Sequence, residues 1–132
     1  MKNILVFILD HNSVQGNFLK YSLSSSGIKN VIIFRTAEEC LYSIQKTRVP
    51  DFIIADTALT STTDLEFLKM IENIDPSIPV IFYSDNEEMS HIAHLMEAGA
   101  TDYIVKTGDN PNWIRELTSN LQYLIKEEFR PR

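Results

Sequence analysis

The stretch Asp51-Phe-Ile-Ile-Ala-Asp56 places four apolar residues between two acids near the middle of the chain. A short apolar run without polar alternation is typical of a strand buried on both faces of a parallel sheet. Four similar runs lie on either side of it, at residues 4–9, 31–34, 80–83 and 103–105. We therefore predict five buried strands, with residues 52–55 as the third.

Segments in which apolar residues recur with helical spacing lie between these runs and after the last one. In chain order, the predicted apolar stripes are Val14, Phe18 and Tyr21; Ala37, Cys40, Leu41 and Ile44; Phe67, Leu68, Ile71 and Ile74; Met89, Ile92, Ala93 and Met96; and Ile114, Leu117, Leu121, Leu124 and Ile125. A regular alternation of strands and helices requires right-handed crossovers and helices on both faces of the sheet. The predicted fold class is thus α/β, a doubly wound five-stranded parallel sheet.

Composition narrows the range of functions. The 132 residues carry 18 acidic side chains against 12 lysines and arginines, a net charge of −6. That charge repels phosphate backbones and anionic lipid, so we expect no direct nucleic-acid or membrane partner. The single cysteine, Cys40, excludes an internal disulfide framework and a cysteine-rich metal cluster. The run at 4–9 is too short to span a bilayer. We expect one cytoplasmic domain over residues 2–127 and a short C-terminal tail, 128–132.

Four residues that can carry chemistry directly follow predicted strands. Asp10 follows the first strand, Asp56 the third, Ser84 the fourth and Lys106 the fifth. In a doubly wound sheet the carboxyl ends of the strands lie at one edge, where ligands bind. Two acids, a hydroxyl and a lysine at one edge are suited to binding a cation and a phosphoryl group.

The chemistry of each residue type suggests a role at such a site. The carboxylate of Asp56 can act as a nucleophile toward a phosphoryl donor. Lys106 can place a mobile positive charge near the phosphoryl oxygens, and the Ser84 hydroxyl can donate a hydrogen bond to them. Magnesium, which prefers oxygen ligands, can be held by Asp10, Asp56 and a loop carbonyl such as that of Ala58.

Four sequence motifs in a fixed order identify a family resemblance. They are Ile4-Leu-Val-Phe-Ile-Leu-Asp10, Asp51-Phe-Ile-Ile-Ala-Asp56, Pro79-Val-Ile-Phe-Tyr-Ser84 and Gly99-Ala-Thr-Asp-Tyr-Ile-Val-Lys106. From Lys2 to about Glu127 the chain resembles the receiver domain of bacterial two-component response regulators. The resemblance implies a flavodoxin-like (βα)5 fold with strand order 2-1-3-4-5.

The resemblance also implies roles for individual residues. Asp56 would be the phosphoacceptor, and Asp10 would belong to the acid pair that organises magnesium. Ser84 and Lys106 would contact the new phosphoryl group, and Tyr103 would be the aromatic switch residue that moves inward with Ser84. The family uses the face formed by its fourth helix, fifth strand and fifth helix to contact partners. The implied partners are a sensor histidine kinase or phosphotransfer protein and a downstream protein, and a homodimer is left open.

One departure from the family pattern bears directly on the predicted metal site. His11 stands where the second acid of the magnesium pair is usual, and a neutral imidazole is a poor magnesium ligand. Loss of a carboxylate beside the ion removes Coulomb attraction. We therefore expect Mg²⁺ to be the cofactor but to bind weakly, with His11 contributing little to its coordination.

Two hypotheses about function follow. The first is a receiver in a phosphorelay, phosphorylated on Asp56 and switching protein contacts through its partner-binding face. Such a domain is no enzyme beyond magnesium-assisted self-phosphorylation from a phosphodonor and slow autodephosphorylation. The alternative is a pseudo-receiver that binds a protein partner independently of phosphorylation, because His11 has weakened the metal site.

Overall fold

Strands and helices alternate strictly over residues 3–128, which a computed structural model describes. The elements are β1 (Leu5–Leu9), α1 (Ser13–Ser25), β2 (Asn30–Phe34), α2 (Ala37–Lys46), β3 (Phe52–Asp56), α3 (Asp64–Ile74), β4 (Val80–Ser84), α4 (Met89–Glu97), β5 (Asp102–Val105) and α5 (Trp113–Glu128). The five predicted strands match within one residue at each end. Of the predicted tail at 128–132, residue 128 ends α5, and residues 129–132, like residues 1 and 2, lie outside the described residues.

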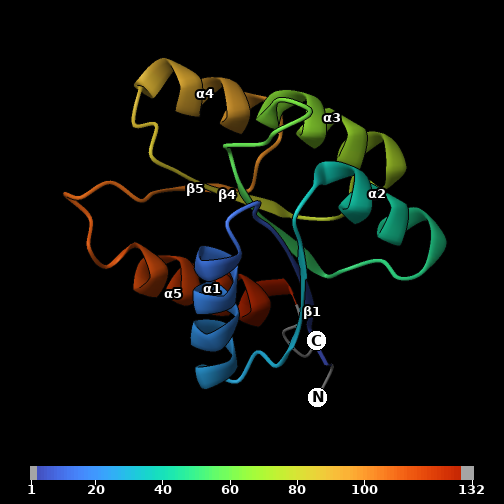
Figure 1. The fold of residues 1–132 in the computed structure, drawn as a ribbon, viewed down its shortest axis with the longest axis horizontal. Coiled ribbons are helices and arrows are strands. Elements are labelled where there is room, and N and C mark those ends of the chain that lie inside the picture. Colours follow the sequence, from blue (N-terminus) through green and yellow to red (C-terminus); the bar gives the residue numbers. More distant parts are fainter. Residues whose placement is uncertain (1–2, 129–132) are drawn as a thin grey trace.

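The strands form one parallel sheet in the order β2-β1-β3-β4-β5, which confirms the predicted fold class and strand order. Helices α1 and α5 cover one face of this sheet, and α2, α3 and α4 cover the other (Figure 1). Strand β3 lies at the centre, with Asp56 opposite Tyr83 of β4 in the register. The first and third strands therefore end side by side, next to the end of the fourth.

A separate apolar core fills each face of the sheet. Alternate residues of β1 divide between them: Phe7 and Leu9 face the core under α2 and α3, whereas Val6 and Ile8 face the core under α1 and α5. Every residue of β1, β3 and β4 is buried. Burial on both faces explains why these strands appear in the sequence as unbroken apolar runs.

The predicted apolar stripe of α1 does not face the sheet. Val14, Phe18 and Tyr21 are 73%, 63% and 73% exposed, and the buried residues of this helix are Gly16, Leu19 and Leu23. The helix carries two apolar stripes, and packing selects the one with the glycine. A Cβ atom at Gly16 would lie 3.3 Å from Ile33 Cγ2, so the glycine lets the first turn approach the sheet closely.

The stripe predicted for α4 is also wrong. Met89 and Met96 are 76% and 40% exposed, and the buried residue of this helix is Leu95. Helix α4 packs against β5, which is the edge strand of the sheet, and so has little sheet surface to cover. The stripes of α2, α3 and α5 do face the cores, through Cys40 and Ile44, Phe67, Leu68 and Ile71, and Leu117 and Leu121.

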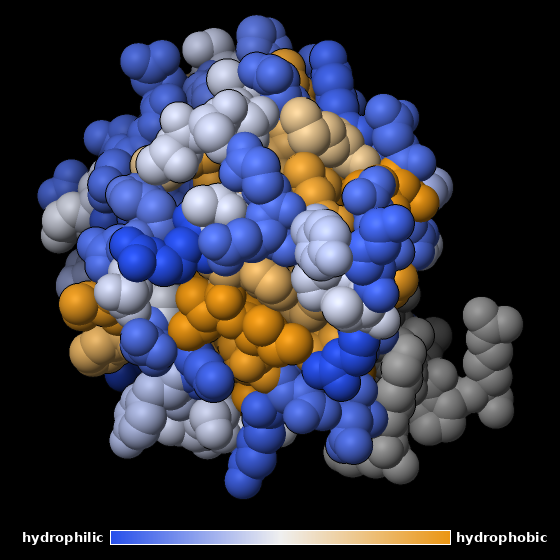
Figure 2. All heavy atoms as spheres, turned by 45° about the vertical axis from the view of Figure 1, so that its right-hand side comes forward, coloured by the Kyte–Doolittle hydropathy of each residue, from blue (hydrophilic) through white to orange (hydrophobic). Residues whose placement is uncertain are grey.

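Within residues 3–128, no helix combines the length and the hydropathy needed to cross a membrane. Figure 2 shows one face of the molecule, on which hydrophilic side chains surround a limited apolar area.

Candidate functional site

The four residues predicted to form a site come together at the carboxyl edge of the sheet. Asp10, Asp56 and Ser84 are almost fully buried, at 0%, 2% and 1% exposure. The side chain of Lys106 is 10% exposed, and its Nζ lies 2.7 Å from Asp56 Oδ2. The strand topology thus places two acids, a hydroxyl and a lysine within one small region, as the sequence predicts.

Asp56 receives hydrogen bonds on both carboxylate oxygens. Its Oδ2 accepts from Lys106 Nζ at 2.7 Å and from Gln15 Nε2 at 2.9 Å. Its Oδ1 accepts from the backbone N–H of Ala58 at 2.9 Å. A buried carboxylate is costly to desolvate, and a lysine partner with further donors offsets that cost.

Asp10 is just as fully bonded. Its Oδ2 accepts from Tyr83 Oη at 2.7 Å and from Gln15 Nε2 at 2.6 Å, and its Oδ1 accepts from the backbone N–H of Asn12 at 2.9 Å. Burial, and then the negative charge of Asp10, raise the pKa of Tyr83 well above its usual value. Tyr83 is therefore a protonated donor at any physiological pH.

Gln15 is a site residue that the sequence reasoning missed. Its Nε2 donates to both carboxylates, and its Oε1 accepts from Lys106 Nζ at 3.1 Å. It lies in the first turn of α1, whose N-cap Asn12 accepts hydrogen bonds from the N–H groups of Val14 and Gln15. The sequence does contain a signal for Gln15: it is an amide side chain in the first turn of the helix that follows β1 and Asp10.

The donor set does not fit a divalent cation as it stands. The Gln15 amide already bridges the two carboxylates, and protein donors bind each of their four oxygens. His11 is exposed, and its backbone carbonyl accepts from Arg35 Nη2 at 3.4 Å. Within the described part of the chain, no group of three or more His, Cys, Asp or Glu residues is placed to hold a metal. The Ala58 carbonyl stays a predicted ligand.

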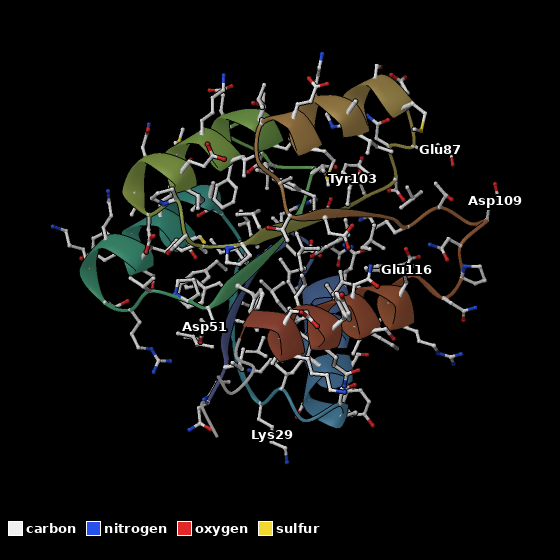
Figure 3. The ribbon with its side chains drawn as sticks, turned by 180° about the vertical axis from the view of Figure 1, so that it is seen from behind. Lys29, Asp51, Glu87, Tyr103, Asp109 and Glu116 are labelled. Atoms are coloured by element: carbon white, nitrogen blue, oxygen red, sulfur yellow. The ribbon has the colours of Figure 1, made fainter. Side chains whose placement is uncertain are left out.

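Ser84 and Tyr103 are linked through the loop after β4. Ser84 Oγ accepts hydrogen bonds from Thr57 Oγ1 at 2.5 Å and from the backbone N–H of Asn86 at 2.9 Å. Tyr103 Oη donates to the backbone carbonyl of Asn86 at 2.6 Å. Figure 3 shows Tyr103 on β5 beneath α4. The pKa of Tyr103 is raised above its usual value, because the effect of partial burial exceeds the opposite effect of the neighbouring Ser84 hydroxyl.

A second contact ties α4 to the rest of the molecule. His91 Nε2 on α4 lies 2.8 Å from Asp64 Oδ2 at the start of α3. The His91 and Tyr103 rings pack edge to face, with their centroids 6.3 Å apart. His94, three residues further along this helix, is exposed. Helix α4 buries only Leu95 among its described residues, and the His91–Asp64 contact holds it to α3 close to Tyr103, the predicted switch residue.

A family model for the response regulator receiver domain matches residues 6–118. Among curated proteins, the two-component response regulator ORR1 of Oryza sativa subsp. japonica is 32% identical over 111 residues, covering 76% of this chain and 48% of the relative. The KDP operon transcriptional regulatory protein KdpE of Escherichia coli (strain K12) is 30% identical over 126 residues, covering 96% of this chain and 52% of the relative.

Solved structures show the same fold. The receiver domain of the Francisella response regulator 1452 superposes with a TM-score of 0.83 at 23% identity, covering 96% of this chain and 99% of that one. The chemotaxis response regulator CheY4 of Vibrio cholerae gives 0.77 at 21% identity, covering 91% and 99%. The chain spans about half the length of the curated relatives it matches.

Proposed function

We propose that this chain, which belongs to the response regulator receiver family of two-component systems, is a switch driven by phosphorylation of Asp56. Receiver domains are generally non-enzymatic signalling modules that interact with histidine kinases or phosphotransfer proteins and with downstream effectors. The observation that carries the proposal is the pairing of the buried Asp56 carboxylate with Lys106 Nζ at 2.7 Å, beside Ser84.

In the proposed reaction, Asp56 is the nucleophile toward a phosphohistidine. An Asp56 carboxylate oxygen bonds to phosphorus while the P–N bond breaks, and the imidazole nitrogen keeps the electron pair and takes a proton from water. Lys106 offers its charge to the phosphoryl oxygens, and Ser84 offers its hydroxyl. Slow autodephosphorylation reverses the modification, as water bonds to phosphorus and the Asp56 carboxylate leaves.

The cofactor of this reaction follows the family. Receiver domains generally bind Mg²⁺ at the phosphorylation site. We propose that this chain binds the ion weakly, because His11 replaces an acid and the Gln15 amide bridges Asp10 and Asp56.

The proposed output passes through Ser84 and Tyr103. When the Ser84 hydroxyl turns to a phosphoryl oxygen, its hydrogen bonds with Thr57 and Asn86 change. Asn86 also binds the Tyr103 hydroxyl, so the loop ahead of α4 moves with the aromatic ring. The face formed by α4, β5 and α5, which includes the exposed Met89, then changes its affinity for a downstream protein.

The proposed phosphodonor is a kinase or phosphotransfer protein that carries a phosphohistidine in the cytoplasm. Exposed Val14, Phe18 and Tyr21 form an apolar strip on α1 that begins beside Gln15. A donor protein seated on this strip would bring its phosphohistidine to the edge that holds Asp56. Direct binding to nucleic acid or membrane forms no part of this proposal, and a homodimer remains a further candidate partner.

The test is phosphorylation by a small phosphodonor. The protein is incubated with acetyl phosphate or phosphoramidate and excess Mg²⁺, and intact mass is followed over time. We expect one added phosphoryl group on the native chain and none on Asp56→Asn. The matched control is Asp51→Asn, which changes the other acid of the same strand motif outside the site. Equal labelling of native chain and Asp56→Asn would contradict the assignment of Asp56.

A second measurement separates a working switch from a modification without consequence. Beryllofluoride is a phosphoryl mimic, and its effect on amide NMR signals is recorded with and without magnesium. Shifts that require Asp56 and reach Ser84, Tyr103 and α4 are expected. Shifts confined to the neighbourhood of Asp56 would contradict the proposed path to the partner-binding face.

The alternative function is a pseudo-receiver that binds its partner independently of phosphorylation. The saturated hydrogen bonding of Asp10 and Asp56 favours it, because the site is complete without a metal or a phosphoryl group. The absence of phosphorylation at saturating donor and millimolar magnesium would reject the first function in favour of this one.

A further inference from the structure

The Gln15 side chain occupies the space between the two buried acids of the site. Its Nε2 lies 2.6 Å from Asp10 Oδ2 and 2.9 Å from Asp56 Oδ2, and its Oε1 accepts from Lys106 Nζ. One amide therefore contacts every charged side chain of the network. Asp10 and Asp56 are the acids that would hold a divalent cation, and the amide donates to one carboxylate oxygen of each.

The charges of this network are not balanced. Two carboxylates are buried, and among the described residues Lys106 is the only cationic side chain in contact with either. The Gln15 amide supplies hydrogen bonds but no net charge. A divalent cation would supply the missing charge, so the two acids favour an ion that the amide excludes.

We propose that Gln15 is a built-in plug of the cation position, which holds the two acids together in the absence of metal and must swing out before a divalent ion binds. The inference rests on the proposed function, in that the Asp56 edge is taken as the phosphoryl site. Gln15 then sets the metal affinity of the domain and, through it, the metal concentration at which Asp56 is ready for a donor.

The surroundings of Gln15 allow such movement. Its backbone is fixed by the N-cap Asn12, and the neighbouring Gly16 packs against the sheet, with Asp10 Cβ and Ile33 Cγ2 close by. The Gln15 side chain itself is only half-buried, whereas Asp10 and Asp56 are almost fully buried. A change of side-chain rotamer can therefore release the amide to solvent without moving the helix.

The chain contains a reporter for the test. Trp113 is its only tryptophan, and its ring stacks on Tyr83 with a centroid separation of 5.3 Å and an interplanar angle of 26°. Tyr83 in turn donates to Asp10. Binding of a metal at Asp10 is expected to change Trp113 fluorescence, and calorimetric titration gives the same dissociation constant without relying on it.

The experiment compares Mg²⁺ binding by the unphosphorylated native chain and by two variants. Gln15→Met keeps the length of the side chain but removes the donor, and we expect it to tighten binding by about tenfold, the effect of one hydrogen bond to a charged group. Gln15→Glu adds a third carboxylate and should tighten binding further. Gln45→Met, on the exposed surface of α2, is the matched control and should leave affinity unchanged.

The outcomes separate this inference from the proposed function. Unchanged or weaker metal binding by Gln15→Met, in a variant that keeps the native circular dichroism, would overturn the plug even if Asp56 is phosphorylated. Tighter binding supports the plug even if no donor phosphorylates Asp56. Should Gln15→Met fail to fold, Gln15→Ala gives the same comparison, because it also removes the amide.

Discussion

At the scale of single residues, Tyr83 connects the site with the core beneath it. Its side chain is completely buried, its ring stacks on Trp113, and Lys106 Nζ lies 5.4 Å from the centre of that ring. Its hydroxyl donates to Asp10, a residue 73 positions away in the sequence. The same side chain thus packs in an apolar cluster and satisfies an otherwise costly buried acid.

Removing that hydroxyl should destabilise the protein. Tyr83→Phe keeps the ring contacts but takes one donor from the buried Asp10 carboxylate, and we expect the free energy of unfolding to fall by about 1–3 kcal/mol. Urea denaturation at pH 7 measures the difference, and we expect the slope of the unfolding free energy against urea concentration to be unchanged. Tyr123→Phe is the control, because Tyr123 is 63% exposed and its hydroxyl should contribute little. Equal stability of the two variants would contradict the role assigned to the Tyr83 hydroxyl.

At the scale of elements, α1 has two apolar faces, one buried in the core and one exposed to solvent. Leu19 and Leu23 enter the core under α1 and α5, whereas Phe18 and Tyr21 face solvent. The N-cap Asn12 and the close approach at Gly16 fix the rotation of the helix. That rotation directs Gln15 toward the acids and leaves the second apolar face exposed to solvent.

Matched truncations on adjacent residues test this orientation. Leu19→Ala opens a cavity in a closed core and should cost about 2–5 kcal/mol of unfolding free energy. Phe18→Ala removes a larger side chain that is 63% exposed, and we expect a change within about 0.5 kcal/mol. Urea denaturation compares both variants with the native chain. A cost at Phe18 as large as that at Leu19 would mean that α1 is rotated so that Phe18 faces the sheet.

At the scale of the whole molecule, one sheet serves two cores. Cys40 lies in the core under α2 and α3, and Trp113 packs against the core under α1 and α5. The strands between them contribute alternate side chains to both, so neither core can be lost without exposing the other. Such an arrangement favours a single cooperative unfolding transition.

Each core carries its own probe of this cooperativity. Cys40 is the only cysteine, it is fully buried, and burial raises the pKa of its thiol to about 12. It should therefore resist a thiol reagent until the chain unfolds. We expect the urea midpoint from Cys40 labelling to coincide with that from Trp113 fluorescence, with Cys40→Ser as the blank for labelling. Labelling that precedes the fluorescence change would show that the two cores unfold separately.

Local patterns in the sequence are enough to predict the strands and the positions that end them. A strand buried on both faces is an apolar run whatever its neighbours are, so residues 52–55 and their counterparts stand out without tertiary information. Because parallel strands end at one edge, the order of the strand ends along the chain suffices to bring Asp10, Asp56, Ser84 and Lys106 together. The strand order within the sheet, in contrast, follows from the family resemblance and not from periodicity.

Tertiary structure alone decided which helix faces are buried and how the acids are satisfied. Helical spacing in α1 is compatible with either of two apolar faces, and the fit of Gly16 against Ile33 selects one. The donors to Asp10 and Asp56 include Gln15 and Tyr83. Packing of α1 on the sheet brings Gln15 to the acids, and the pairing of β4 with β3 places Tyr83 near them. The Gln15–Asp56 and Tyr83–Asp10 hydrogen bonds join residues 41 and 73 positions apart. These two bonds leave no local pattern, because they depend on helix rotation and strand register and not on neighbouring sequence.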